Sequence, residues 1–110
     1  METIKLNYGD ILICDCGYIK KVYCEWNGEQ ELRFDGLKLI KVLHEGDDGV
    51  YYVKAGDKFK SLGVDSGRIW AMKAEFDITV EIDSGLSGYL VVKDTPVEEI
   101  KLLDYSELSQ

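Results

Sequence analysis

The sequence has few of the residues that build metal centres, disulfide frameworks and membrane helices. Its 110 residues include one histidine, one proline and three cysteines, and no apolar run approaches the roughly 18 residues of a transmembrane helix. The opening METIKLNYGD lacks the apolar block of a signal peptide. Because three cysteines cannot all pair and no export signal precedes them, we expect reduced thiols and a cytoplasmic location. The composition excludes membrane-spanning, collagen-like, coiled-coil and disulfide-framework proteins.

The sequence also lacks a recognisable catalytic constellation. His44 is the only histidine, so a Ser–His or Cys–His pair would depend on it alone, and no GxSxG nucleophile motif occurs. The glycine-containing segments 46–49 and 63–67 lack the Gly-Lys-[Ser/Thr] of a phosphate-binding loop. We therefore predict a protein that is not an enzyme and has no catalytic residue, cofactor or bound metal.

Asp-Ser-Gly occurs twice, at 65–67 and at 83–85, each time after apolar residues. Retroviral-type aspartic proteases place a catalytic carboxylate in a similar local pattern, and their chemistry needs two carboxylates close enough to share a proton. No apolar-Gly-Arg floor motif follows either copy here. Asp, Ser and Gly also favour turns for independent physical reasons, so we interpret both copies as turns.

Four soft ligands for zinc exist in principle, namely Cys14, Cys16, Cys24 and His44. Cys-x-Cys on a strand is a poor chelating unit, and the histidine is distant from the cysteines in sequence. We favour free cysteines buried in strands. The acidic segment 45–48 lacks the alternating oxygen ligands of a calcium loop, so we interpret it as a solvated turn.

Acidic side chains outnumber basic ones by 21 to 13, which gives a formal net charge of −8. Such a surface repels the phosphates of nucleic acids and anionic membranes, so we expect neither as a direct ligand. The same charge speeds encounter with a basic protein. Half of the net charge lies in residues 94–110, where five acidic residues face Lys101 alone.

Strand signals dominate the chain. Alternating apolar residues, or runs rich in β-branched and aromatic residues, are separated by glycine-containing turns. We expect one domain over 1–110, mainly β, folded as a small antiparallel barrel or a two-layer sandwich. The segments that we assign to strands are 3–6, 10–14, 18–26, 31–34, 37–43, 50–54, 59–64, 68–74, 77–82 and 89–93.

The C-terminal segment carries the one helix signal. Thr95-Pro96-Val97-Glu98 has the form of a capping box with proline at the first helical position. Val97, Ile100 and Leu103 then recur at helical spacing. We therefore predict one short helix over about 96–104, packed on the sheet.

Asn27-Gly28 is the strongest hairpin signal, because both positions of a two-residue turn need positive φ. The simplest register pairs Trp26 with Glu29, and it would mix apolar and charged side chains on one face of the hairpin. We therefore expect a bulge or a longer loop there and leave the register open.

Two segments, GDDGVYYV at 46–53 and LGVDSGRIW at 62–70, resemble a Gly-Asp-Gly-x-Tyr-x-Val and Val-Asp-Ser-Gly-Arg pattern of uncharacterised small bacterial and bacteriophage β-proteins. The chain departs from that pattern by an extra residue at Asp48 or Gly49. The resemblance implies no catalytic residues. It implies a bacterial or phage origin, and it implies that the two loops lie together at one end of the sheet.

These features predict a small acidic protein-binding module: an inhibitor, or an immunity or anti-defence protein, that covers a basic surface of a partner protein. Charge would steer the encounter, and Tyr and Trp side chains near turns would supply lasting contacts. The alternatives are a small-ligand-binding β-barrel with a pocket at its mouth, and a zinc protein or hydrolase built on the cysteines and histidine. The residues that we assign to the partner-binding surface are Glu45, Asp47, Asp48, Asp65, Arg68, Trp70, Glu98, Glu99 and Asp104.

Overall fold

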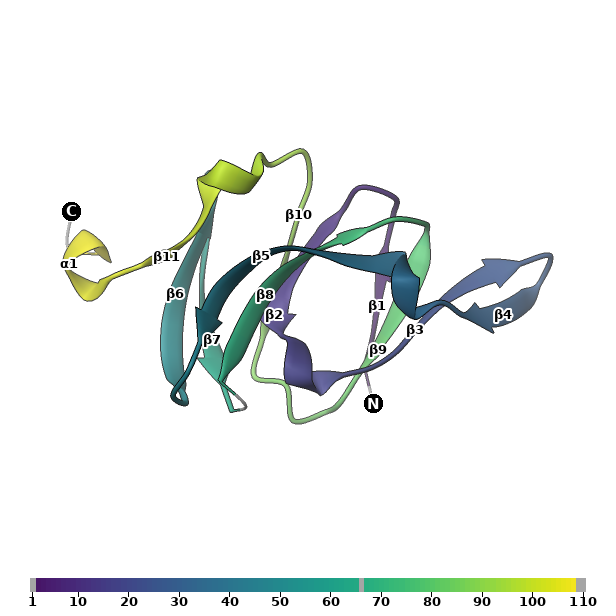
Figure 1. Ribbon diagram of the computed structural model, residues 1–110, viewed down its shortest axis with the longest axis horizontal. Coiled ribbons are helices and arrows are strands. Elements are labelled where there is room, and N and C mark those ends of the chain that lie inside the picture. Colours follow the sequence, from purple (N-terminus) through teal and green to yellow (C-terminus); the bar gives the residue numbers. More distant parts are fainter. Residues whose placement is uncertain (1, 66, 109–110) are drawn as a thin grey trace.

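A computed structural model describes residues 2–65 and 67–108 and is built almost entirely of strands (Figure 1). Its elements are β1 (Glu2–Leu6), β2 (Ile11–Asp15), η1 (Cys16–Tyr18), β3 (Ile19–Trp26), β4 (Glu29–Leu32), η2 (Phe34–Gly36), β5 (Leu37–Glu45), β6 (Gly49–Ala55), β7 (Lys58–Val64), β8 (Arg68–Ala74), β9 (Ile78–Ile82), β10 (Tyr89–Val92), η3 (Val97–Glu99), β11 (Ile100–Leu103) and α1 (Tyr105–Leu108). The elements η1, η2 and η3 are single turns of 3₁₀-helix. The prediction of a mainly β protein is confirmed.

The strands form three antiparallel sheets. Sheet A has the strand order β1-β9-β3-β4, sheet B has β10-β2-β8-β5, and sheet C has β11-β6-β7. Two apolar clusters hold them together: one joins sheet A to sheet B, and the other joins sheet B to sheet C. Sheet B is therefore the middle layer of three, and the expectation of a closed barrel or a two-layer sandwich is wrong.

Both faces of β2 are covered in this arrangement. Leu12 and Cys14 pack toward sheet A, whereas Ile11 and Ile13 pack toward sheet C. A strand that is buried on both faces has an unbroken apolar run in place of alternation. The apolar run ILIC at 11–14 has this form, and it fits a strand that has a sheet packed on each of its faces.

Lysine side chains connect sheets B and C where the backbone ladders stop. Lys60 Nζ donates to the carbonyl oxygen of Tyr89 at 2.7 Å, and Lys58 Nζ donates to that of Val91 at 3.3 Å. At the opposite side of these sheets, Lys41 Nζ donates to the carbonyl oxygen of Ile100. Ammonium groups thus satisfy strand carbonyls at the gaps, so the two sheets approach one another without closing into a barrel.

The C-terminal helix predicted over about 96–104 is wrong. Residues 97–99 form η3, and β11 then pairs with β6, placing Ile100 opposite Ala55. The Ile100 side chain is fully buried in the cluster between sheets B and C. Pairing with the edge of β6 satisfies backbone groups on both strands and buries this side chain, and these gains outweigh a capping signal that is only local. The α-helix that does form, α1, is four residues long and follows β11.

The β3–β4 hairpin has the two-residue turn that Asn27-Gly28 predicts. Both turn residues have positive φ, 51° and 83°, and Trp26 pairs with Glu29. The expected bulge or longer loop at this turn is therefore wrong, because every residue of β4 is exposed and no buried face demands apolar partners. The irregularity in β3 lies nearer its start, between Ile19 and Lys21. The hairpin projects from the body at the side of sheet A (Figure 1).

Within the part of the chain that the structure describes, no helix has the length and apolar character needed to cross a membrane.

Candidate functional site

Two turns meet at one end of sheets B and C. The Gly46 N–H donates to the Gly67 carbonyl oxygen at 2.7 Å, and Glu45 lies opposite Arg68 across the β5–β8 pair. Gly67 has φ +85°, and a Cβ there would lie 2.0 Å from the Gly46 oxygen, so only glycine allows this contact. The loop at 45–48 therefore lies beside Asp65, Gly67 and Arg68. We refer to residues 45–50, 63–65, 67–68 and 83–87 as the turn end.

The acidic loop of the turn end is held in one conformation by two aromatic rings. The Tyr51 hydroxyl donates to the carbonyl oxygen of Asp47 at 2.9 Å, and His44 Nε2 lies 3.1 Å from the same oxygen. The two rings pack with their centroids 3.8 Å apart. Glu45 and Asp48 are exposed on this loop, so their charges are presented from a defined backbone.

Tyr18 connects the two Asp-Ser-Gly segments. Its hydroxyl donates to Asp65 Oδ2 at 2.5 Å, while its carbonyl oxygen accepts the Asp83 N–H at 2.9 Å. The hydrogen bond to Asp65 raises the pKa of Tyr18 to about 12, because ionisation would place two negative charges together. Tyr18 thus contacts both segments, although it precedes Asp65 by 47 residues.

The two aspartates have different partners, which argues against a protease dyad. Asp83 Oδ1 accepts the Gly85 N–H at 3.0 Å, and its Oδ2 lies 3.6 Å from Lys20 Nζ. The Gly85 N–H and the nearby ammonium lower the pKa of Asp83, whereas a shared proton requires one carboxyl with a raised pKa. The Leu86 N–H donates to the Asp83 carbonyl oxygen, closing a turn. The turn interpretation is confirmed for this copy; Ser66, in the first copy, lies outside the described residues.

A surface depression of about 410 Å³ lies beside Tyr18. Glycines allow its walls to approach: a Cβ on Gly63 would lie 2.4 Å from Ser87 Oγ, and a Cβ on Gly85 would lie 3.0 Å from the Tyr18 ring. The Val50 side chain is 64% exposed at its rim. The depression thus combines an apolar rim with the Asp65 carboxylate. Its lining residues are Tyr18, Gly49, Val50, Gly63, Val64, Asp65, Gly85 and Ser87.

The nine residues that the sequence assigned to partner binding do not form one surface. Five of them lie at the turn end, and these are Glu45, Asp47, Asp48, Asp65 and Arg68. Trp70 is half-buried against the cluster between sheets A and B, with the Arg68 guanidinium 5.6 Å from its ring centroid. It belongs to the core more than to a rim.

The remaining three predicted residues lie outside the turn end, in two different places. The carbonyl oxygen of Glu99 accepts the Gly56 N–H, which places Glu98 and Glu99 at the end of β6 opposite to the turn end. Asp104 follows Leu103, which pairs with Tyr52, so β11 runs back along β6 and Asp104 lies between the two ends of that strand. Sequence reasoning missed Tyr18 and Val50, which line the depression: Tyr18 is far from both acidic loops in sequence, and Val50 reads as the first residue of a strand.

The cysteines and the histidine do not converge on a metal site. Cys14 and Cys24 are buried in the cluster between sheets A and B, Cys16 is half-buried, and all three are free thiols. Burial raises the pKa of Cys14 to about 12, which opposes the thiolate form that metals bind. Among the residues described, no group of three or more His, Cys, Asp and Glu side chains could hold a metal ion. The zinc alternative therefore has no ligand set here.

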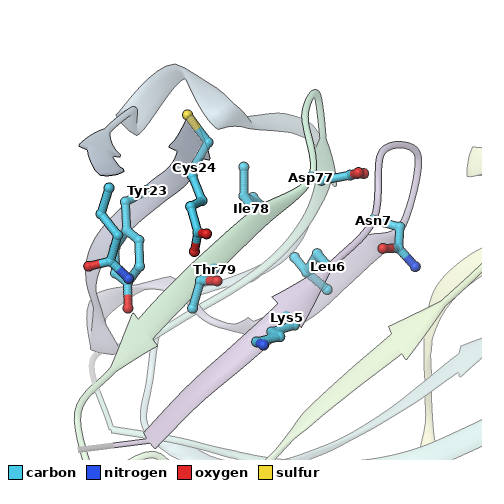
Figure 2. A pocket seen from close by; sticks show the side chains of 10 residues that line it. Lys5, Leu6, Asn7, Tyr23, Cys24, Asp77, Ile78 and Thr79 are labelled. Atoms are coloured by element: carbon cyan, nitrogen blue, oxygen red, sulfur yellow. The ribbon is translucent and has the colours of Figure 1, made fainter. Parts of the chain in front are cut away.

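The small-ligand alternative expected a pocket at the mouth of a barrel, and the described sheets close no barrel. A depression of about 220 Å³ lies instead on the outward face of sheet A (Figure 2). Lys5, Thr79 and Tyr23 stand side by side there on three neighbouring strands. Its lining residues are Lys5, Leu6, Asn7, Tyr23, Cys24, Glu25, Gln30, Asp77, Ile78 and Thr79.

Comparison with known proteins identifies no family for this chain. No protein-family model, curated protein or solved structure matches the chain.

Proposed function

We propose that this chain is a small acidic, non-enzymatic binding protein whose turn end covers a basic surface of a partner protein. The observation that carries the proposal is the hydrogen bond between Gly46 and Gly67, which brings the two acidic turns onto one surface. The described residues of the turn end include five carboxylates, Glu45, Asp47, Asp48, Asp65 and Asp83, and one cation, Arg68, while Lys20 lies 3.6 Å from Asp83. Their field favours encounter with a positively charged partner and raises its association rate.

The rigidity of the acidic loop supports a role in binding. Tyr51 and His44 both contact the Asp47 carbonyl oxygen, so the loop has little conformational entropy left to lose when a partner docks. The depression next to it suits a lysine or arginine side chain. The aliphatic stem of such a side chain would contact Val50, and its charged head would reach Asp65.

An inhibitor, immunity protein or anti-defence protein acts in this way when it covers the basic surface of a toxin or of a nucleic-acid-handling enzyme. We place this chain in that class. The three free thiols support a reducing compartment, in keeping with the cytoplasmic location that we propose. No residue of the turn end is assigned a catalytic role.

The test uses two variants with equal changes in charge. Wild-type protein first captures a basic partner from a lysate of the source organism. The turn-end variant is E45K/D47K/D48K. We expect the association rate of the variant with that partner to fall at least about tenfold at low salt, because the steering charge is reversed. Surface plasmon resonance at several salt concentrations measures the rate.

The matched variant is D57K/E98K/E99K, which changes the charge by the same amount at the acidic residues around Gly56, at the other end of β6. We expect its association rate to stay within about twofold of wild type, because those residues lie away from the turn end. Equal losses in the two variants would show that only net charge matters and would contradict the proposed surface. Failure of wild type to capture any basic partner would also contradict it. Thermal unfolding of each variant checks that the fold is kept.

A further inference from the structure

The β3–β4 hairpin ends sheet A in an edge that no other described strand covers. The Arg33 N–H donates to the Val22 carbonyl oxygen at 2.8 Å, and Cys24 pairs with Glu31 two residues along. Antiparallel ladders alternate between bonded and non-bonded pairs. The backbone N–H and C=O groups of Gln30 and Leu32 therefore point away from β3, along the open edge.

The hairpin also exposes apolar side chains that the core does not use. Trp26 is 50% exposed, Leu32 is 56% exposed, and Phe34, directly after the hairpin, is 64% exposed. All four residues of β4 are exposed. An open edge beside exposed apolar groups is the combination to which an extended segment adds as a further strand.

The acidic residues around the hairpin turn indicate which kind of extended segment could bind at this edge. Residues 25–32 contain three glutamates and no lysine or arginine. Glu29 and Glu31 lie on the same face of β4, because alternate residues of a strand share a face. A second copy of this chain would bring like charges together at the edge, whereas a strand carrying lysine or arginine would pair with them.

We propose that the β4 edge binds an extended basic segment of a partner protein, which adds to sheet A as a fifth strand. Backbone groups of Gln30 and Leu32 supply the new ladder bonds. Basic side chains of the segment lie over Glu29 and Glu31, and apolar side chains on its other face contact Leu32. This surface belongs to sheet A and is separate from the turn end, which lies on sheets B and C (Figure 1).

The experiment uses an octapeptide of alternating lysine and valine as the probe. Binding is measured by calorimetry, and amide hydrogen exchange is followed by NMR. We expect the probe to slow exchange of the Gln30 and Leu32 amides at least about tenfold, because both N–H groups become ladder donors. A peptide of alternating lysine and proline has the same charge but lacks the N–H groups at the positions that would face Gln30 and Leu32, so it should give no such protection. Binding of the lysine–valine probe without protection of these amides would overturn the proposal.

Three variants separate strand addition from general attraction. We expect E29K/E31K to weaken binding at least about tenfold, and the equally charged control E98K/E99K to stay within about twofold of wild type. Q30P removes one outward N–H without changing charge or a hairpin ladder bond, so it should weaken binding about fivefold or more. Equal weakening by the two charge-reversal variants would overturn the proposal. So would sedimentation that shows wild type forming dimers through this edge.

Discussion

The β2–β8 pair and the β3–β4 hairpin are both antiparallel strand pairs, yet they have opposite environments. All five residues of β2 are buried, with Leu12 and Ile13 fully inaccessible, whereas all four residues of β4 are exposed. The difference comes from position: β2 has a sheet on each side of it, and β4 lies at the free end of sheet A. Antiparallel pairing by itself therefore says little about stability, and the layers around a pair decide how much it contributes.

Burial converts this difference into free energy. A fully buried leucine or isoleucine contributes about 1.5–3 kcal/mol relative to an exposed one. Sheet B therefore concentrates the stability of the molecule, because it contributes side chains to both apolar clusters. The exposed hairpin contributes little of this burial free energy. It leaves its backbone edge and its glutamates open to solvent, where a partner could contact them.

The largest expected effect comes from shortening one leucine in each region. Leu12→Ala should lower the free energy of unfolding by about 2–5 kcal/mol, because it leaves a cavity between sheets A and B. Leu32→Ala should change it by less than about 0.5 kcal/mol, because that side chain is largely exposed. Urea denaturation measures both values. A loss at Leu32 as large as that at Leu12 would contradict the comparison.

A second pair of substitutions compares two glycines with almost the same φ. Gly28 at the hairpin tip has φ +83°, and an added Cβ would meet no atom within 4 Å, so Gly28→Ala should cost only backbone strain, about 1–2 kcal/mol. Gly67→Ala meets the Gly46 oxygen as well, so we expect it to cost about 1–3 kcal/mol more. Guanidinium denaturation measures the difference. Equal losses of unfolding free energy for the two substitutions would show that the Gly46–Gly67 contact adds no constraint at Gly67.

The smallest expected effect concerns two aspartates. Asp10, just before β2, is buried, and it accepts hydrogen bonds from Lys93 Nζ and from the Asn7 N–H, both at 2.9 Å. Burial alone would raise the pKa of Asp10, but these two partners outweigh it and the pKa is lowered. Asp10→Asn should cost about 1–3 kcal/mol near neutral pH. Asp35→Asn, next to the hairpin, removes an exposed pair with Arg33 and should change stability little.

The pH dependence of Asp10 follows from the sign of its shift. Because its pKa is lower in the folded than in the unfolded chain, the carboxylate stabilises the fold fully above its ordinary pKa of 3.8. That stabilisation is lost as pH falls through the lower folded value. The gap in unfolding free energy between wild type and Asp10→Asn should therefore stay constant above about pH 5 and shrink in acid. Denaturation at several pH values tests this, and a gap that widened in acid would contradict it.

Local signals predicted the strands well but placed the C-terminal segment wrongly. The Asn27-Gly28 signal depends only on the φ values of adjacent residues, and the two-residue turn forms, although the bulge or longer loop expected from the mixed face of the hairpin does not. The capping pattern from Thr95 is equally local, yet the open edge of β6 captures Ile100 in a strand. The unbroken run at 11–14 is typical of a strand covered on both faces, but a run of four apolar residues does not show which two sheets will cover it.

The strand-rich character, the hairpin signal and the negative charge can all be read from the amino acids, because each depends on residue types or on near neighbours. Only strand pairing and sheet packing decide that Glu98 lies at the other end of β6 from Glu45 and Asp65, and only they bring Tyr18 into contact with Asp65. Such contacts join residues far apart in the chain, and their geometry is set by strand order and by the stacking of the sheets, which no local pattern encodes.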